Sequence, residues 1–365
     1  MNNLEIIILT KQSLREAINH NKFWDNLYEA PFSINKAKWM LKNARAEEND
    51  TFAILGYEKY KIIAFVYLVP DLIKIGDNKT KKIFWSQRWW VSNKFKETVL
   101  STYVKNQSLV ECNNQVVVKF LGEKTKAFYN KQPFQKFSKR NRYIIIFSID
   151  YDLLVLKKKK LRKLAPILKV LDKFSRVFIA LINTLKSEKN SKGVSYTEVS
   201  IINNQVWQFI EKQSINDFVL KSKAYINWQI DNNQYQSITE SEKNSKQNCL
   251  LGTIAKKIYN INDVIKKENT IIGFISCFIS GNRMIVRYFV TTDMYYDDCL
   301  NVLIKKMISN KCTILQTEDS VLGERISKSF FKIYADKKEL VSLIHNAINQ
   351  NTKLSLLKDQ DGNFF

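Results

Sequence analysis

The sequence predicts two copies of one α/β fold (α+β), each copy a mixed, mostly antiparallel sheet flanked by helices. Three observations predict this architecture. The chain has 365 residues, which is the length of two domains of ordinary size. Hydrophobic residues make up 45% and charged residues 25%, as in globular proteins and unlike disordered or disulfide-rich chains. Finally, landmarks of the first half recur in the same order in the second half.

The repeat is visible at four pairs of landmarks. These are Trp39 with Trp228, residues 62–66 (IIAFV) with 271–275 (IIGFI), residues 88–91 (RWWV) with 287–290 (RYFV), and residues 132–134 (QPF) with 328–330 (KSF). Because all four follow one order, we expect two tandem domains, residues 1–152 and residues 193–365, joined by residues 153–192. The first copy is the candidate catalytic domain.

Local patterns predict the elements of each copy in order. Runs of β-branched and aromatic residues between turn residues mark strands, and polar stretches with spaced apolar residues mark helices. The first copy is expected to contain strand 6–9, helices 11–29 and 33–44, strands 51–57, 61–69 and 81–91, helix 94–108, strand 116–118, helix 123–131 and strand 143–149. The second is expected to contain strand 196–200, helices 203–212 and 216–230, strands 249–259, 270–279 and 283–291, helix 294–309, strand 312–317 and helix 319–328. Helices that alternate with strands in this way indicate a mixed sheet covered by helices.

A basic, amphipathic segment lies between the copies. Four consecutive lysines open it, and Pro166 suits the first turn of the helix that follows. Its apolar residues recur every three or four positions, at Leu164, Ile167, Leu168, Leu171, Phe174, Phe178, Leu181, Ile182 and Leu185. Nine apolar positions favour a buried stripe, that is, an interdomain helix packed on both domains with solvated lysines. The alternative is that residues 157–186 lie on an anionic membrane surface.

The net charge of +23 is concentrated in one region, since residues 51–200 hold 30 basic and 11 acidic side chains. Such a region attracts nucleic acid, anionic lipid or phosphorylated ligands, although an AT-rich genome favours lysine codons as well. No base-stacking motif of RNA-binding domains is visible, so a nucleic-acid partner would depend on charge alone. We therefore expect no nucleic acid partner, except tRNA in one alternative given below.

The cysteines and histidines exclude several kinds of site. The five cysteines (Cys112, Cys249, Cys277, Cys299 and Cys312) form no CxxC pair, and the chain has two histidines, His20 and His345. A zinc site and a histidine-based triad are therefore not expected, and scattered thiols suit a reducing compartment. The start of the sequence is too charged for a signal peptide, and no apolar run is long enough to span a membrane. We expect a cytoplasmic protein whose membrane contact, if any, is peripheral to the inner membrane.

Residues 88–91 (RWWV), the polar helix and strand after them, and residues 127–134 (AFYNKQPF) together resemble the GNAT acyltransferases. The resemblance covers residues 3–150 and, more weakly, residues 195–335. It implies transfer of an acyl group from acetyl-CoA or another acyl-CoA to an amine or hydroxyl, without a metal. The tandem arrangement resembles bacterial members that act in surface-polysaccharide biosynthesis, which implies a small-molecule acceptor such as an amino sugar or nucleotide sugar.

The resemblance also implies where coenzyme A binds. In the family, a strand ending in a hydrophobic residue and valine meets a helix whose N-terminus holds the pyrophosphate. The phosphate loop falls on residues 96–101 (KETVLS), where Lys96 keeps the positive charge and Val99 and Ser101 occupy the small-residue positions. In the second copy, residues 294–299 (MYYDDC) hold two carboxylates and no glycine, so the first copy is the expected site. The expected coenzyme A contacts are Trp90, Val91, Lys94, Lys96, Thr98 and Val99.

The resemblance assigns Tyr129 as the general acid that protonates the departing thiolate, and the aligned position of the second copy is Arg325. A general base is less evident: Asp71, or a water held by Ser86 or Gln87, are the candidates. Expected acceptor contacts are Trp85, Arg88 and Trp89. Because side chains alternate along a strand, Trp85 and Trp89 should share one face and Trp90 the other. These tryptophans equally suit packing between sheet and helices, and Arg88 could cap the sheet edge.

Two other functions fit the sequence. Peptidoglycan-bridge aminoacyl transferases of the Fem type are also tandem copies of this fold without the glycine loop, and an aminoacyl-tRNA donor would suit the basic region. A non-catalytic binding or scaffold module with degenerate domains is the other.

Overall fold

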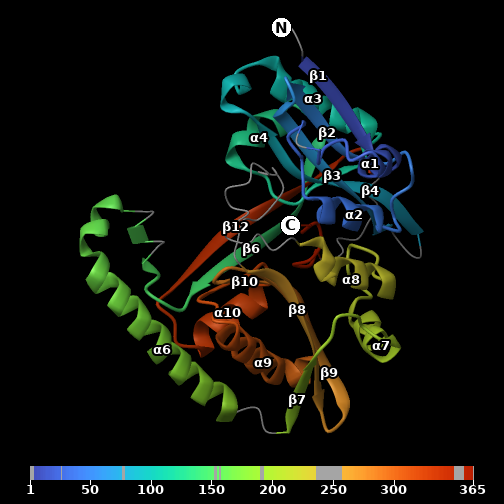
Figure 1. The fold of residues 1–365 in the computed structure, drawn as a ribbon. Coiled ribbons are helices and arrows are strands. Elements are labelled where there is room, and N and C mark those ends of the chain that lie inside the picture. Colours follow the sequence, from blue (N-terminus) through green and yellow to red (C-terminus); the bar gives the residue numbers. More distant parts are fainter. Residues whose placement is uncertain are drawn as a thin grey trace. The chain divides into compact units, whose positions relative to one another are not determined.

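The computed structural model describes residues 4–25, 27–75, 79–151, 154–155, 158–189, 193–235, 257–348 and 357–364. The chain forms two compact units, shown in Figure 1. Unit 1 comprises Met1–Lys139, Asn216–Lys256 and Leu340–Phe365, and unit 2 comprises Arg140–Ile215 and Lys257–Glu339. The predicted domain boundaries, after residues 152 and 192, both fall inside unit 2, because each unit takes segments from both halves of the sequence.

Unit 1 contains a mixed sheet in the order β1-β2-β3-β4-β5-β12. Neighbouring strands are antiparallel except β4 and β5, which are parallel. The bounds are β1 (Leu4–Thr10), β2 (Thr51–Glu58), β3 (Lys61–Ile75), β4 (Lys79–Val91), β5 (Val116–Val118) and β12 (Tyr334–His345). The part of β12 from Leu340 onward belongs to this unit and pairs with β5, with Leu343 opposite Val118.

Helices cover both faces of the unit 1 sheet, and the sheet separates two apolar cores. Helices α1 (Lys11–Asn19), α2 (Ile34–Leu41) and α8 (Lys223–Ile230) contribute Leu14, Trp39 and Trp228 to one core, which also contains Trp85. Helices α3 (Val99–Glu111) and α4 (Glu123–Tyr129) contribute Val104 and Tyr129 to the core on the opposite face.

Side-chain caps set where several helices begin. Thr10 and Ser13 form a reciprocal capping box at α1, and Ser33 and Thr98 accept backbone N–H groups at α2 and α3. Such caps satisfy donors that the first helical turn leaves without partners.

Unit 2 repeats the sheet of unit 1 in order and orientation. Its order is β7-β8-β9-β10-β11-β6, antiparallel except for the parallel pair β10 and β11. The bounds are β7 (Val194–Glu198), β8 (Ile258–Lys267), β9 (Thr270–Ser280), β10 (Arg283–Thr291), β11 (Ile314–Thr317) and β6 (Phe134–Ile146). Its helices are α6 (Ala165–Lys189), α7 (Asn204–Gln213), α9 (Tyr296–Ser309) and α10 (Ser320–Ser329). The predicted mixed α/β class is thus confirmed, with the last strand of each sheet supplied by the other half of the sequence.

Two landmark residues of the repeat contact each other inside unit 1. The indole rings of Trp39 and Trp228 stack with centroids 4.2 Å apart and planes 10° apart. Trp39 Nε1 donates to the carbonyl of Trp228 at 2.6 Å, and Trp228 Nε1 donates to the carbonyl of Trp39 at 2.9 Å. Each of the two residues therefore both stacks on the other and donates a hydrogen bond to its backbone carbonyl.

The sequence prediction was wrong at three strands. Strand β6 begins at Phe134, whereas the prediction placed that strand at 143–149. Strand β12 was not predicted, because its first half, YADKKE, is almost wholly exposed and carries four charges, and its buried part begins only at Leu340. Strand β8 begins at Ile258, whereas the prediction began at 249, and residues 249–256 lie outside the described part.

Helix α6 exposes the apolar face that the sequence interpretation expected to be buried. Seven of the nine stripe residues are exposed, whereas Asp172, Ser175, Asn183 and Ser187 are buried. The helix therefore packs on its polar and small side chains, and the stripe is not a buried one.

The remaining sequence expectations concern thiols, metals and membrane spans. Cys112, Cys277, Cys299 and Cys312 are buried and free, and Cys249 lies outside the described residues. In the described ranges no group of His, Cys, Asp or Glu could hold a metal ion. Nor does any helix there combine the length and apolarity needed to cross a membrane.

Candidate functional site

The site begins at a β-bulge in β4. Tyr67 of β3 lies opposite Arg88 and Leu68 opposite Ser86, so Gln87 is an extra residue without a counterpart. An extra residue reverses the alternation of faces beyond it. Trp85 and Trp90 consequently pack on the α1 side of the sheet, and Trp89 packs on the α3 side. The expectation that Trp85 and Trp89 share a face was wrong for this reason.

The bulge lies where the ladder between β4 and β5 stops. Among the described residues this parallel ladder joins Phe84 to Val116 and Trp85 to Val117. Strand β4 then continues through Ser86 and the bulge to Val91. Ser86 is therefore the first residue of β4 beyond the ladder with β5.

Three polar side chains meet at Ser86 inside the α3-side core. Lys105, from the buried face of α3, donates from Nζ to Ser86 Oγ at 2.8 Å. The hydroxyl of Tyr129, at the end of α4, shares a hydrogen bond with Ser86 as well. The Lys105 ammonium also lies 5.7 Å from the centre of the Tyr129 ring. Lysine, serine and tyrosine thus form one continuous hydrogen-bonded chain.

Burial sets the protonation of this cluster. Desolvation lowers the pKa of Lys105 to about 8, and the nearby Cys112 opposes this shift. Desolvation raises the pKa of Tyr129, with the hydrogen bond from Ser86 acting in the opposite direction. Near neutral pH the phenol keeps its proton, and Lys105 titrates close enough to neutrality to exchange one.

We expect the lowered pKa of Lys105 to make stability depend on pH. Between pH 8 and 10.5 the unfolded chain binds the Lys105 proton and the folded chain does not, so this group stabilises the fold increasingly as pH rises. Over that interval the wild type should gain about 3 kcal/mol relative to Lys105→Met. Denaturant unfolding of both proteins between pH 7 and 10.5 measures the difference. Parallel curves would show that Lys105 is not desolvated.

Two nitrogen atoms beside the cluster are buried without a hydrogen-bond partner in the described part of the chain. They are Gln87 Nε2, at the bulge, and Trp89 Nε1. The indole of Trp89 lies 4.9 Å from the Phe128 ring and 6.3 Å from the Tyr129 ring. Buried donors of this kind are costly unless something accepts from them, which favours a ligand carbonyl or hydroxyl at this place.

The predicted phosphate loop, residues 96–101, spans the start of α3. Thr98 caps the helix by accepting from the N–H of Leu100 at 3.3 Å, and Val99, the first helical residue, is 82% exposed. Lys96 is exposed and Lys94 pairs with Glu58 at 3.0 Å. No acidic residue occupies the first turn. The N–H groups of the first turn and Lys96 offer positive charge to a pyrophosphate, whereas Glu97, directly before Thr98, opposes it.

The remaining predicted residues have separate positions. Val91 is buried at the end of β4, in the α3-side core, and Trp90 is half-buried on the opposite face. Arg88 lies at the surface, and partial desolvation lowers the pKa of its guanidinium. Trp85 is fully buried, and its Nε1 donates to Asp71 at 2.8 Å.

Asp71, a candidate base from the sequence, is occupied in a buried network. It pairs with Arg45 and accepts from Trp85 Nε1 and, at 2.8 Å, from the hydroxyl of Tyr225. It belongs to the α1 side of the sheet, whereas Ser86 faces the α3 side. Its role is structural.

Sequence reasoning missed Lys105, although the sequence holds a signal for it. Leu100, Val104 and Leu109 mark the buried face of α3, and Lys105 lies on that same face. A lysine inside an apolar stripe is a candidate for a shifted pKa.

Unit 2 has the same bulge without the same chemistry. Val286 lies opposite Cys277 and Tyr288 opposite Ser276, so Arg287 is the extra residue and corresponds to Gln87. The predicted match of Arg287 to Arg88 is therefore wrong by one position. Val286 then stands where unit 1 has Ser86. The first turn of α9 carries Asp297 and Asp298, whose charges oppose an anion there.

Comparisons of the sequence with family models and with curated proteins give no match. Solved structures are similar at low identity. A GCN5-related N-acetyltransferase from Kribbella flavida is 8% identical, with 93% of this chain and 70% of that chain covered at a TM-score of 0.47. One from Anabaena variabilis is 11% identical, with 93% and 72% covered at 0.46. A probable N-acyltransferase from Enterococcus faecalis is 8% identical, with 94% and 72% covered at 0.49.

Proposed function

We propose that unit 1 is an acyltransferase that moves an acyl group from acyl-CoA to an amine or hydroxyl of a small molecule. The observation that carries this proposal is the hydrogen-bonded chain Lys105–Ser86–Tyr129 at the bulge of β4. Lys105 lies six residues, or about 9 Å along the axis, after the first residue of α3. A protonated phenol and an adjacent proton source suit a reaction that must protonate a leaving thiolate.

The acceptor nitrogen or oxygen attacks the thioester carbonyl carbon, and the bond between that carbon and sulfur breaks. Tyr129 gives its proton to the departing sulfur. Ser86 and Lys105 then return a proton to the phenolate, and the proton lost by the acceptor passes to solvent or to neutral Lys105. No other reactant is required.

The N–H groups at the start of α3, together with Lys96, would hold the pyrophosphate, with the exposed Lys94, Thr98 and Val99 beside it. Of the other two contacts predicted from the sequence, the Trp90 side chain packs on the α1 side of the sheet and Val91 is buried in the α3-side core. Gln87 Nε2 and Trp89 Nε1 would donate to the acyl oxygen or to the acceptor. The acceptor would lie toward Trp89 and Arg88. An amino sugar or nucleotide sugar in the cytoplasm meets these requirements. Unit 2, which lacks the serine, would act as a tandem copy without its own donor site.

We expect acetyl-CoA, a longer acyl-CoA and free CoA to raise the unfolding temperature at physiological salt. A ligand that binds only the folded state adds about 2.7 kcal/mol at a hundredfold excess over its dissociation constant. Thermal-shift titration measures this, and Lys96→Gln should require a higher concentration for the same shift. The exposed Lys212→Gln, on α7 of unit 2, is the matched control.

The two alternatives give different results in the same assay. The Fem-type reaction predicts little response to CoA but tRNA binding that weakens steeply with salt. A scaffold predicts neither, but liposome binding that falls when Lys157–Lys160 are neutralised. Absence of a shift with every CoA ligand would overturn the proposal.

A further inference from the structure

Helix α6 is held on unit 2 by polar contacts. Asn183 exchanges two hydrogen bonds of 2.9 Å with the backbone of Phe331, and Ser175 accepts from the N–H of Ile149 at 3.1 Å. Asp172 accepts from the N–H of Asp150 at 3.2 Å and pairs with Arg176 at 2.7 Å. Ile179 is the large apolar residue among those that the helix buries. An amphipathic helix of a folded domain ordinarily does the reverse.

The apolar side of α6 is correspondingly open. We call this surface the α6 stripe: its residues, between 44% and 68% exposed, are Ile167, Val170, Leu171, Phe174, Val177, Phe178, Leu181 and Leu185. At 100° per residue they occupy an arc of about 120°, and they run about 27 Å along the helix. Phe174 and Phe178 stack, and Phe331, itself 48% exposed, extends the surface beside Phe178. Exposed apolar surface this continuous marks a site of interaction.

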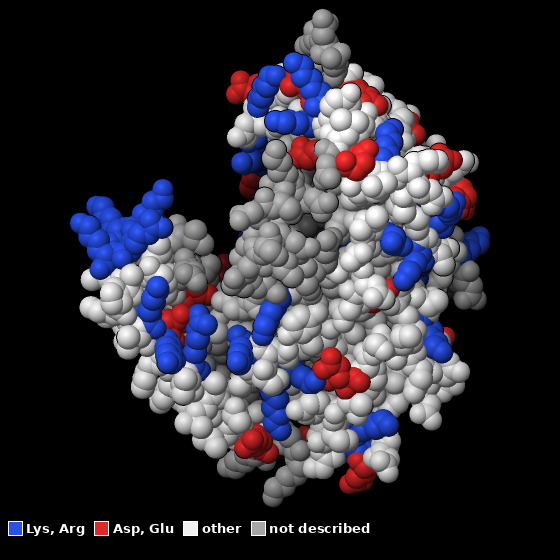
Figure 2. All heavy atoms as spheres, in the orientation of Figure 1, with Lys and Arg blue, Asp and Glu red and all other residues white. Residues whose placement is uncertain are grey.

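Cationic side chains border the α6 stripe. Figure 2 shows Lys and Arg gathered at the amino-terminal end of α6, where Lys159–Leu164 form the short helix η2. Along the helix, Lys169, Lys173 and Lys186 are exposed. At 100° per residue, Lys173 lies between the apolar and the packed side. Residues 158–188 hold nine basic and two acidic side chains, and one of the acids, Asp172, is buried and already paired with Arg176.

We propose that the α6 stripe docks on a membrane surface that contains anionic phospholipid. The stripe would enter the boundary between headgroups and acyl chains, while Lys173 and the lysines of η2, whose long stems reach past the apolar residues, contact the phosphates. The apolar and the cationic side chains would then both contact lipid, and the polar face of α6 would keep its contacts with the rest of unit 2.

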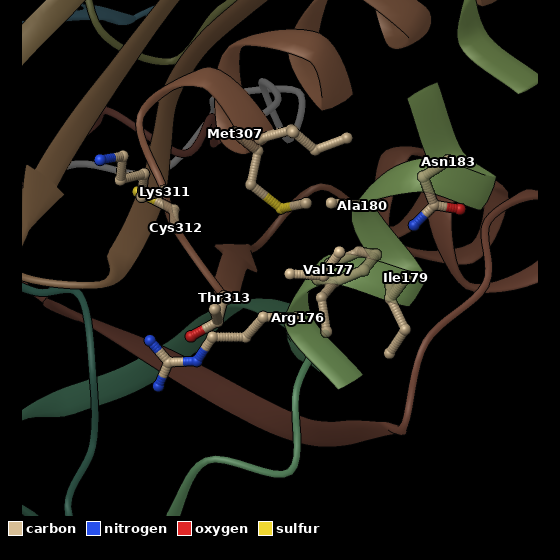
Figure 3. Close-up of a pocket in the computed structure, with 11 residues that line it drawn as sticks. Arg176, Val177, Ile179, Ala180, Asn183, Met307, Lys311, Cys312 and Thr313 are labelled. Carbon is tan, nitrogen blue, oxygen red and sulfur yellow. The ribbon is translucent and has the colours of Figure 1, made fainter. Parts of the chain in front are cut away.

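A pocket adjoins the stripe. It lies between α6 and α9, has a volume of about 280 Å³, and is lined chiefly by apolar side chains such as Val177, Ala180 and Met307 (Figure 3). Val177 belongs to both the pocket and the stripe, and Lys311 and Arg176 stand at the lining. An apolar recess with cations beside it suits one acyl chain below an anionic headgroup.

Charge argues against a second copy of the chain as the occupant. Two α6 stripes facing each other would bring two sets of lysines into one interface, where Glu188 is the one exposed acid that each copy offers within residues 158–188. An anionic lipid surface meets the same lysines with opposite charge, each contact being attractive within a Debye length.

The proposal is tested by flotation of the full chain with two kinds of vesicle. One contains phosphatidylcholine alone, and the other contains about one third phosphatidylglycerol. Binding is expected to the anionic vesicles only and to weaken with salt. Replacing Phe174 and Leu181 together by serine should reduce it by about tenfold or more, since each loses buried apolar area. Replacing Lys159, Lys160 and Lys163 by glutamine should reduce it as well. Ile201→Ser is the matched control, because Ile201 is as exposed as Phe174 but lies outside α6.

All the substituted side chains are exposed, so circular dichroism and the unfolding temperature should not change. Failure of the wild type to bind anionic vesicles would overturn the proposal, as would equal binding by the Phe174→Ser, Leu181→Ser protein. Size-exclusion chromatography without lipid tests the other occupant, a second copy of the chain. A wild-type dimer that is monomeric in the double variant would assign the stripe to self-association. None of these outcomes depends on acyl transfer, so they are independent of the proposed reaction.

Discussion

Replacing Asp71 by alanine is expected to lower the free energy of unfolding by about 3–5 kcal/mol, because it leaves a buried guanidinium without its counter-charge. Asp71 has no exposed surface, and the side chain of Arg45 is 7% exposed. Arg45 also donates to the carbonyl of Leu220 and lies 3.3 Å from the centre of the Tyr225 ring. The Asp71 carboxylate on β3 therefore connects the segment after α2, strand β4 and helix α8 within unit 1.

Urea unfolding followed by tryptophan fluorescence measures this loss, since Trp85 donates to the same carboxylate. The control is Glu48→Ala. Glu48 pairs with Arg15 by two hydrogen bonds, but both side chains are nearly half exposed. Solvent screens such a pair, so its loss should lower the free energy of unfolding far less than the loss of Asp71. Equal effects of the two substitutions would mean that the Asp71 network is hydrated rather than buried.

The sequence predicted most elements because their signals are local. Period-two and helical patterns place β10 at 283–291 and β5 at 116–118 at their observed bounds. The exchange of β6 and β12 between the two sheets has no local signal, because a strand's neighbour is chosen by contacts hundreds of residues apart. The alignment of the two copies was wrong by one residue at Arg287, because the sequence pattern does not show which residue of each strand is the extra one in the β-bulge.

The candidate site was predictable in part. Tyr129 and Ser86 were named from the sequence, and the structure brings them into contact. Lys105 was missed, since a lysine within a helix is ordinarily solvated and its burial depends on how α3 packs. The orientation of α6 was misjudged because periodicity reports that one face is apolar and does not report which face the protein buries.

The largest effect on catalysis is expected from Tyr129→Phe, which should lower kcat for acyl transfer by about 10²–10⁴-fold, the contribution of a positioned proton donor. Release of free CoA thiol from acetyl-CoA, with glucosamine or water as acceptor, measures the rate. Stability should change little, because phenylalanine keeps the ring contacts with Trp89 and Phe134. Tyr103→Phe is the control, since Tyr103 lies exposed on α3.

The pH dependence of kcat distinguishes a role of Lys105 and Ser86 in proton transfer from a role in packing alone. If Lys105 replenishes the proton of Tyr129 through Ser86, kcat of the wild type should fall as pH rises through about 8, where Lys105 loses its proton. Lys105→Met should have a low kcat without this inflection, and Ser86→Ala, which breaks the chain between the two, should behave in the same way. An active Tyr129→Phe enzyme, or a wild-type inflection that survives in Lys105→Met, would remove the corresponding residue from the proton path and leave the thiolate to be protonated by water.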